Sequence, residues 1–272
     1  VAERSDTCHL TTSHSSSITS NKTMRHQKIA NPDHGEWLSA FDQVRIINLR
    51  SRTDRRNETM REFTRYDWPI PDSRVSFFDA MAPQEAAGFP SAGVRGCFLS
   101  HLGVLREAWR AGCDSVLVLE DDIAFTRDMD RQASVAVRSL QDQDWDIAYF
   151  GHDYGNQPGD LSWIPVLEPR PLAHCYAVNG RALPALVAFL EQVLQRPPGH
   201  PDGGPMHFDG ALSTFVKRTP GVRAFRCSRN LVYQRPSRTD LHAVSVLDRY
   251  SWLAPVAQLY RAIKRLYWHR VR

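Results

Sequence analysis

Several features that identify whole classes of protein are missing from this 272-residue sequence. No run of 18 apolar residues occurs, so no membrane-spanning helix is expected. The patterns GxxxxGK[ST], GxSxG, HExxH and GxGxxG are absent, which argues against P-loop phosphotransferases, serine hydrolases, zinc proteases and dinucleotide dehydrogenases. The five cysteines are scattered and form no CxxC pair, which argues against a zinc ribbon or a disulfide scaffold and favours a reducing compartment.

Acidic residues are absent from the last 22 residues, and this absence explains the net charge of +4. Residues 251–272 hold five Lys and Arg, whereas residues 44–250 hold 25 basic and 25 acidic residues. A nucleic-acid-binding protein usually spreads basic charge over its folded surface, so the neutral body predicts no nucleic-acid partner. Its 42% hydrophobic and 24% charged residues are typical of globular protein and are enough for one large domain.

The two ends of the chain differ in composition from the body. Eleven of the first 23 residues are Ser or Thr, and such a segment has too few apolar side chains to offset the entropy lost on ordering, so we expect 1–36 to be a disordered arm. Residues 251–272 place apolar and aromatic side chains at three- and four-residue steps among cations, which is typical of a helix on an anionic membrane surface. A terminal helix packed on the domain is the alternative. Since the arm also lacks a signal-peptide core, we expect a cytoplasmic protein, peripheral on the inner face of a membrane.

Between these ends, short apolar and β-branched runs alternate with segments of helical spacing. Val116–Leu119 is entirely apolar, as expected for a strand covered on both faces, and Cys97–Ala111 has helical spacing and stops at Gly112. This alternation predicts an α/β fold over residues 37–250, with one Rossmann-type, mainly parallel sheet flanked by helices. The other expected strands are 44–48, 75–78, 147–150, 222–225 and 231–233, and the other expected helices precede Tyr66 and cover 181–194.

Three consecutive acids follow the apolar strand. Glu120 and Asp122 are two residues apart, so at the end of a strand they point to the same side while Asp121 faces away. Two neighbouring carboxylates repel each other unless a cation or a shared proton lies between them. A hard cation such as Mn²⁺ or Mg²⁺, itself bound to a diphosphate, would meet this need. A polar turn that merely ends a buried strand is the alternative.

Seven segments follow one another along the chain: VRIINLRSRTDRR, FFDAM, GVRGCFLSHLGVLREA, VLVLEDDI, DIAYFGH, AHCYAVNGRAL and LVYQRPSRTDLH. In this order they resemble glycosyltransferase family 25, the lipopolysaccharide-biosynthesis and collagen galactosyltransferase group. The resemblance implies a single GT-A-like catalytic domain and a metal-dependent inverting transfer of galactose or glucose from a UDP-sugar to a saccharide acceptor. It also points to the synthesis of lipopolysaccharide or another cell-surface glycan, for which a lipid-linked acceptor would suit a membrane-bound enzyme. The chain departs from the family at Arg50, where an acid is frequent, and in QRPSRTD, where glycines are frequent.

The resemblance also implies roles for individual residues. Glu120 and Asp122 match the family's metal-binding acids, with Asp122 as the metal ligand and Glu120 supporting the metal or the ribose. The other expected donor-site residues follow the first two strands or lie in the third and last matching segments: Asn48, Leu49, Arg52, Arg56, Asp79, Ser100, His101, Gln234 and Asp240. The structural alternatives are a solvated helix start for the arginines, a helix N-cap for Asp79 and a satisfied interior position for His101.

Inverting transfer needs a base that takes the proton of the acceptor hydroxyl. Asp209, in MHFDGALS at an expected helix start, is the favoured candidate, and Asp153, in GHDYG after a strand, is its competitor. N-capping is the alternative role for Asp209. The alternative function is a non-catalytic relative that binds a sugar nucleotide or a partner protein. The intact pair of Glu120 and Asp122 favours an enzyme, because a binding module has no need of it.

Overall fold

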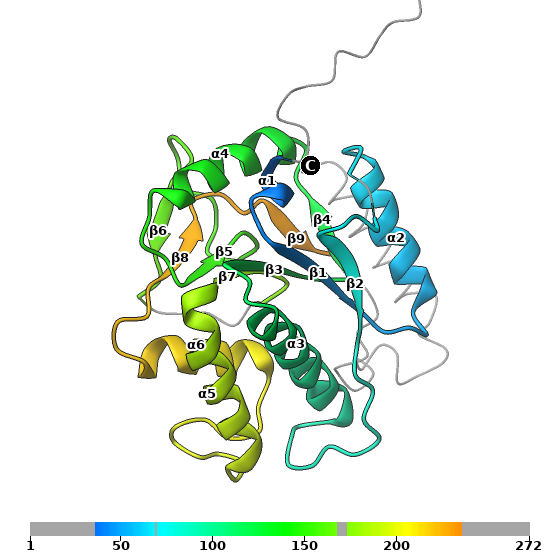
Figure 1. Cartoon of the computed structure of the whole chain (residues 1–272), viewed down its shortest axis with the longest axis vertical. Coiled ribbons are helices and arrows are strands. Elements are labelled where there is room, and N and C mark those ends of the chain that lie inside the picture. Colours follow the sequence, from blue (N-terminus) through cyan, green and yellow to red (C-terminus); the bar gives the residue numbers. More distant parts are fainter. Residues whose placement is uncertain (1–35, 69, 168–172, 236–272) are drawn as a thin grey trace, which may run out of the picture. The chain divides into compact units, whose positions relative to one another are not determined.

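A seven-stranded sheet runs through the part of the chain that the structure describes. The computed structural model describes residues 36–68, 70–167 and 173–235; the expected arm, apart from Glu36, and the expected tail lie outside them. The strand order is β2-β1-β3-β7-β5-β8-β6 (Figure 1). These strands are β1 (Gln43–Asn48), β2 (Val75–Asp79), β3 (Ser115–Glu120), β5 (Ile147–Tyr149), β6 (Trp163–Pro165), β7 (Cys175–Asn179) and β8 (Ala224–Cys227).

Most strands of this sheet point the same way. β1 pairs in parallel with β2 and with β3, and β5 pairs in parallel with β8. β7 lies antiparallel between β3 and β5, so these two strands share one direction, and β6 lies antiparallel on the edge beside β8. The α/β fold with a mainly parallel sheet is therefore confirmed, and the two reversed strands make the sheet mixed.

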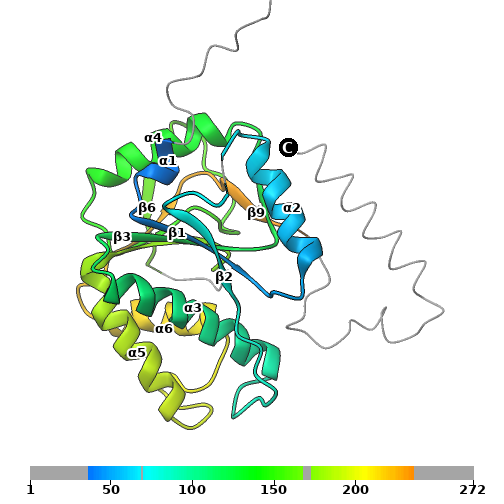
Figure 2. The same cartoon turned by 45° about the vertical axis from the view of Figure 1, so that its right-hand side comes forward.

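Helices cover both faces of the sheet. Figures 1 and 2 show α3 (Ala92–Arg110), α5 (Leu183–Gln195) and α6 (Phe208–Arg218) on one face. The other face carries a two-stranded sheet, β4 (Ile123–Phe125) with β9 (Val232–Gln234), and the helices α1 (Glu36–Ser39), α2 (Thr53–Thr64) and α4 (Met129–Gln141). A short 3-10 helix, η1 (Gly180–Ala182), leads into α5. Among the described helices, none combines the length and the apolar character needed to cross a bilayer.

The all-apolar sequence of β3 follows from this layering. Leu117 and Leu119 pack into the cluster under α1, α2 and α4, whereas Val116 and Val118 pack into the cluster under α3, α5 and α6. All four side chains are fully buried. Alternate residues of a strand point to opposite faces, so a strand covered on both faces must be apolar at every position.

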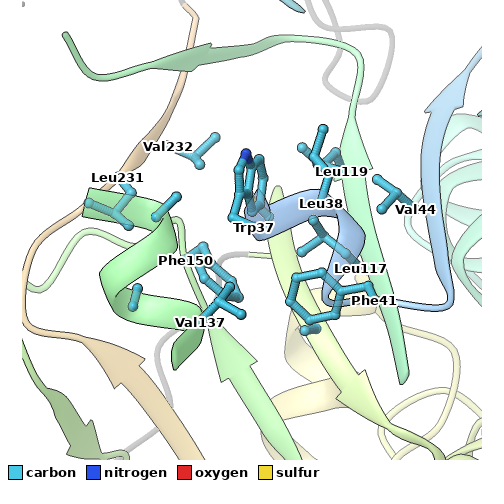
Figure 3. Close-up of a cluster of buried hydrophobic side chains, with 14 of the residues drawn as sticks. Trp37, Leu38, Phe41, Val44, Leu117, Leu119, Val137, Phe150, Leu231 and Val232 are labelled. Carbon is cyan, nitrogen blue, oxygen red and sulfur yellow. The ribbon is translucent and has the colours of Figure 1, made fainter. Parts of the chain in front are cut away.

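An aromatic cluster lies directly beyond the acids that end β3. Trp37 of α1 is fully buried against Leu119 and Phe150 (Figure 3), with its ring 5.9 Å from that of Phe150 and 6.2 Å from that of Phe125 in β4. Phe125 in turn lies 5.2 Å from Phe63 of α2. Because β4 begins one residue after Asp122, this cluster anchors the acid turn on its far side, while β3 anchors it on the near side.

Candidate functional site

The two acids that flank Asp121 face the same side of the turn, as predicted. The Gln234 side-chain nitrogen lies 3.3 Å from Glu120 Oε2 and 3.3 Å from Asp122 Oδ2. Asp121 points elsewhere: Asn48 Nδ2 donates to its Oδ2 at 2.7 Å, and Arg55 Nη1 donates to its Oδ1 at 2.9 Å. The turn therefore separates its three carboxylates into a pair and a single group that faces away, and Arg55 lies closer to the single group, at 2.9 Å, than to Asp122, at 3.9 Å.

Hydrogen bonds to the backbone fix the acid turn. Thr59 Oγ1 donates to the Asp121 carbonyl at 2.8 Å, and Arg235 Nη2 donates to the same oxygen at 2.7 Å. The Arg235 backbone N–H donates to the Asp122 carbonyl, and its guanidinium pairs with Glu58 at 3.0 Å. Helix α2 and the end of β9 thus hold the turn from two sides, which preorganises the carboxylates.

A cavity of about 210 Å³ opens beside these acids. Arg55, the three acids, Gln234, Ser100 and His101 line one part of it. Residues from the end of β1, from the segment after β2 and from the start of α3 line the rest, namely Ile47, Leu49, Ala80, Met81, Ala82, Pro83, Ala92, Gly93, Gly96 and Cys97. A side chain at Gly96 would place its Cβ 2.5 Å from the Met81 carbonyl, so glycine allows α3 to approach this segment. The cavity is charged where the acids lie and apolar beyond them.

Ser100 and His101 lie on the side of α3 that faces this cavity. Ser100 Oγ accepts the Met81 N–H at 2.8 Å and donates to the Gly96 carbonyl at 2.6 Å, which fixes the apolar wall. His101 Nε2 lies 3.4 Å from Glu120 Oε1, and its Nδ1 lies 3.0 Å from the Tyr176 hydroxyl. His101 is therefore both fully buried and in contact with the carboxylate pair, which joins the two roles considered for it.

The two carboxylates of the pair have pKa values that are shifted in opposite directions. Burial, with the charge of Glu120 next, raises the pKa of Asp122 to about 7 from an ordinary 3.8, against the opposing effect of Arg55. Burial alone would also raise the pKa of Glu120, but the hydrogen bond and charge of His101 outweigh it and lower that pKa below the ordinary value. Near neutral pH the pair therefore retains a proton on Asp122 for part of the time, and a cation would replace it.

A second cavity, of about 350 Å³, lies on the other side of Gln234, which lines both. Most of the residues that line it have polar side chains, namely His152, Asp153, Asn156, His174, Asn230, Tyr233 and Gln234, with Gly155 beside them. The Asn156 side-chain oxygen accepts the Asn230 N–H at 2.7 Å, and the Asn230 side-chain oxygen accepts the His152 N–H at 3.1 Å. With their oxygens engaged, both carboxamides are oriented with their NH₂ groups as the remaining donors.

Two buried histidines in the wall of this cavity are neutral. His152 Nε2 donates to the Cys227 carbonyl at 2.7 Å, and His174 Nε2 donates to the Val232 carbonyl at 2.8 Å. Burial lowers the pKa of His152 to about 4 and also lowers that of His174. Gly151 makes room for the second ring, because a Cβ there would lie 2.2 Å from His174 Nε2. The histidines thus provide uncharged walls beside Asp153.

Most of the predicted donor-site residues meet at the first cavity. Leu49, Ser100, His101, Glu120, Asp122 and Gln234 line it. Asn48 is buried behind it on Asp121. Arg52 and Arg56 lie elsewhere: Arg52 pairs with Asp54 at 2.9 Å, and Arg56 lies 4.1 Å above the Phe77 ring.

The arginine in the site is Arg55, which the sequence reasoning missed. Its position could have been found from helical spacing. Arg55, Thr59 and Phe63 are four residues apart, and the last two are fully buried, so α2 turns this face toward the acids.

The remaining predicted site residues are aspartates, and those that the structure describes do not line the first cavity. Asp79 is exposed at the end of β2, and its alternative as a helix N-cap is wrong, because the next helix begins at Ala92 and is capped by Ser91. Asp209 lies in the first turn of α6 and accepts its neighbour's N–H at 2.7 Å, while its charge acts on Cys97 and Tyr149. Asp153 lines the second cavity, and Asp240 lies outside the described residues.

Comparison with known proteins agrees with these motifs. No protein-family model matches the chain. It is 33% identical to procollagen galactosyltransferase 1 of Danio rerio over 131 residues, which are 41% of this chain and 21% of that protein. It is 29% identical to a glycosyltransferase 25 family member of Anopheles gambiae over 142 residues, 46% of this chain and 24% of that protein. The chain is similar to glycosyltransferase family 25.

The similarity to family 25 covers a limited part of its members. The chain matches less than a quarter of the length of these curated relatives, both at about 30% identity. Among solved structures, a glycosyltransferase involved in the glycosylation of the major capsid of PBCV-1 matches 72% of this chain and 95% of that chain, with 13% identity and a TM-score of 0.35.

Asp122→Asn tests the burial of the carboxylate pair through the pH dependence of stability. Between pH 3.8 and about 7 the folded, metal-free protein retains a proton that the unfolded chain has released, so the free energy of unfolding should fall as the pH rises through this window. The carboxamide of the variant cannot ionise, so its free energy of unfolding should decrease less than that of the wild type over this pH range. Urea unfolding in a chelator at several pH values measures it, with the exposed Asp160→Asn as control. Parallel profiles for Asp122→Asn and the wild type would contradict the assignment.

Proposed function

We propose that this chain is a metal-dependent inverting hexosyltransferase that moves galactose or glucose from a UDP-sugar to a saccharide acceptor. The observation that carries the proposal is the pair of Glu120 and Asp122, which face one side together at the rim of a cavity with an apolar far end. The similarity to galactosyltransferases supports the same class of reaction. A non-catalytic relative that binds a sugar nucleotide is the alternative.

The first cavity suits a nucleoside diphosphate. Its apolar wall, which the hydrogen bonds of Ser100 hold in place, offers a surface for the nucleobase. Its acidic part offers carboxylate oxygens. These oxygens are the hard ligands that Mn²⁺ and Mg²⁺ prefer. The raised pKa of Asp122 indicates that a positive charge between the two acids would be favourable. Glu120 and Asp122 would therefore hold the metal. Asp121 stays on Arg55 and Asn48, outside the metal's ligands.

The chemistry divides between the two cavities. When bound, the metal neutralises the charge that develops on the departing diphosphate. The bond from the sugar's C1 to the diphosphate oxygen breaks as the acceptor hydroxyl oxygen bonds to C1 from the opposite face, and a base takes the hydroxyl proton. Gln234, which lines both cavities, is suited to orient the transferred sugar between them.

We assign the base to Asp153 and retain Asp209 as the competitor. Asp153 is exposed in the second cavity among oriented carboxamide donors, which suits an acceptor rich in hydroxyl groups. One oxygen of Asp209 already accepts a backbone N–H in its own helix. A saccharide acceptor in the synthesis of lipopolysaccharide or another cell-surface glycan fits this polar lining, and cytoplasmic action at the inner face of a membrane would bring the enzyme to a lipid-linked form of it.

UDP release from UDP-galactose and UDP-glucose, without acceptor, tests the reaction. We expect release that depends on Mn²⁺ and falls at least about 100-fold in Asp122→Ala, because the leaving group loses its charge partner. Asp160→Ala, an exposed aspartate, is the control. Wild-type release by Asp122→Ala at saturating Mn²⁺ would refute the metal assignment. UDP binding by calorimetry without release would favour the non-catalytic alternative, and no binding would overturn the function.

The two candidate bases are separated by Asp153→Asn and Asp209→Asn. Loss of the base should lower turnover by about 10²–10⁴-fold while leaving UDP binding intact, since the base contacts only the acceptor side. We expect this result for Asp153→Asn and a smaller change for Asp209→Asn, measured as transfer to an acceptor together with UDP calorimetry. The reverse pattern would assign the base to Asp209, and loss of UDP binding with either change would mark that aspartate as structural.

The basic tail is proposed as the membrane contact from its sequence pattern, because 251–272 lies outside the described residues. Deleting 251–272 should release the protein from anionic vesicles in a cosedimentation assay, since the tail carries five cations and an apolar stripe. Neutral vesicles serve as control. Unchanged cosedimentation after the deletion would instead favour a terminal helix packed on the domain.

A further inference from the structure

A second group of metal-ligating side chains meets inside the first cavity. Cys97 and His101 are four residues apart on α3 and therefore project from one face of the helix. Together with Glu120 of β3 they bring one ligand atom each to within 4.8 Å of one another. Among the described residues, no other group of three or more His, Cys, Asp and Glu side chains meets so closely. It contains a thiol and an imidazole, which the carboxylate pair lacks.

The two oxygens of Glu120 serve different neighbours. Oε1 faces His101 Nε2 at 3.4 Å, whereas Oε2 faces the Gln234 amide, which also contacts Asp122. Glu120 thus belongs to two groups at once. The Oε2 side is all oxygen and suits a hard cation, while the Oε1 side combines oxygen with nitrogen and sulfur and suits Zn²⁺.

The His101–Glu120 separation fits a tetrahedral ion. Zn–N and Zn–O bonds of about 2.0–2.1 Å spanning 3.4 Å subtend an angle of about 110° at the metal. One ligand atom of each of the three residues lies within 4.8 Å of the other two, whereas tetrahedral ligands are about 3.3–3.6 Å apart, so a side-chain rotation that brings the sulfur closer would close the site. The fourth position faces the cavity that all three residues line.

The surroundings of His101 orient it for this role. Its ring stacks on Phe208 with 4.0 Å between centroids and 8° between planes, and its Nδ1 contacts the Tyr176 hydroxyl at 3.0 Å. Zinc-binding histidines commonly have their second nitrogen held in this way. In the metal-bound state Nδ1–H would donate to the Tyr176 hydroxyl, and Nε2, which contacts Glu120 in the metal-free protein, would give its lone pair to the ion.

Negative charges surround the sulfur. Burial, followed by the charges of Glu120, Asp209 and Asp122, holds the pKa of the Cys97 thiol well above its ordinary value in the metal-free protein, so a dication that binds there must displace the thiol proton while it neutralises these charges. We propose that Cys97, His101 and Glu120 form a Zn²⁺ site in this cavity, and that zinc bound there opposes the hard cation at Glu120 and Asp122. Two dications on one carboxylate repel each other, and an ion in this position narrows the donor cavity. The zinc site stands without the proposed transfer activity, whereas its inhibitory effect rests on it.

Cobalt and zinc binding to the full chain test the site. Co²⁺ should give a sulfur-to-metal charge-transfer band in the wild type that disappears in Cys97→Ser and Cys97→Ala, and zinc affinity in a chelator competition should fall at least about tenfold. Cys113→Ser is the matched control, because it removes one thiol that is outside the group, and it should keep the band. Melting temperatures of the metal-free variants establish that they are folded.

Three results would overturn the site: no band in the wild type, a band that survives both Cys97 variants, or zinc affinity within twofold of wild type in both. Asp122→Asn should weaken Mn²⁺ binding and leave the cobalt band, and loss of both would refute two separate metal sites. Zinc should lower the Mn²⁺-dependent release of UDP in the wild type and lower it less in Cys97→Ser. A cobalt band without any UDP release would retain the zinc site and refute the transferase, and equal inhibition of both proteins would refute the competition.

Discussion

The repulsion among three consecutive carboxylates is the constraint on which the rest of the site depends. Burial and the charge of Glu120 raise the pKa of Asp122 to about 7, so the native fold holds a charge arrangement that is unfavourable on its own. Arg55 and Asn48 hydrogen-bond Asp121, and Arg55 also lies 3.9 Å from Asp122 Oδ2, so its charge offsets the repulsion between the other two acids only in part. A chain selected for stability alone would have no reason to keep this pair. The loss of folding stability that this repulsion causes is explained if a cation binds between the two acids.

The topology brings the partners of these acids from distant parts of the sequence. β1 and β3 lie side by side in parallel, so Asn48 and Glu120 end at the same edge of the sheet. The reversed strand β7 begins at that edge, and His174, just before it, is thereby buried beside the second cavity. The antiparallel strand β7 therefore places the neutral side chain of His174 at an edge where the other residues come from the carboxyl ends of parallel strands.

The sequence predicts best what depends on short-range pattern. The buried strand 116–119, the same-side geometry of Glu120 and Asp122, and the cavity-facing positions of Ser100 and His101 follow from local periodicity and the family motifs. The strands β4 and β6 were missed, because β4 follows β3 after only a two-residue acid turn and β6 ends in proline, so neither is recognisable as a separate apolar run. Arg55 was missed in favour of Arg52 and Arg56, because neighbouring arginines cannot be told apart without a burial pattern. The N-cap alternative for Asp79 was wrong because Ser91 caps the helix that follows.

The pairing of β4 with β9 connects the two halves of the site. Ile123, the residue after Asp122, pairs in register with Gln234, and the Arg235 N–H donates to the Asp122 carbonyl. The acid turn and the residue that lines both cavities therefore belong to one hydrogen-bonded unit, held at its far side by the Phe125 aromatic cluster. A shift of β9 would move Gln234 away from both acids together. The geometry of the donor side and that of the polar cavity are consequently coupled through two short strands rather than through the large sheet.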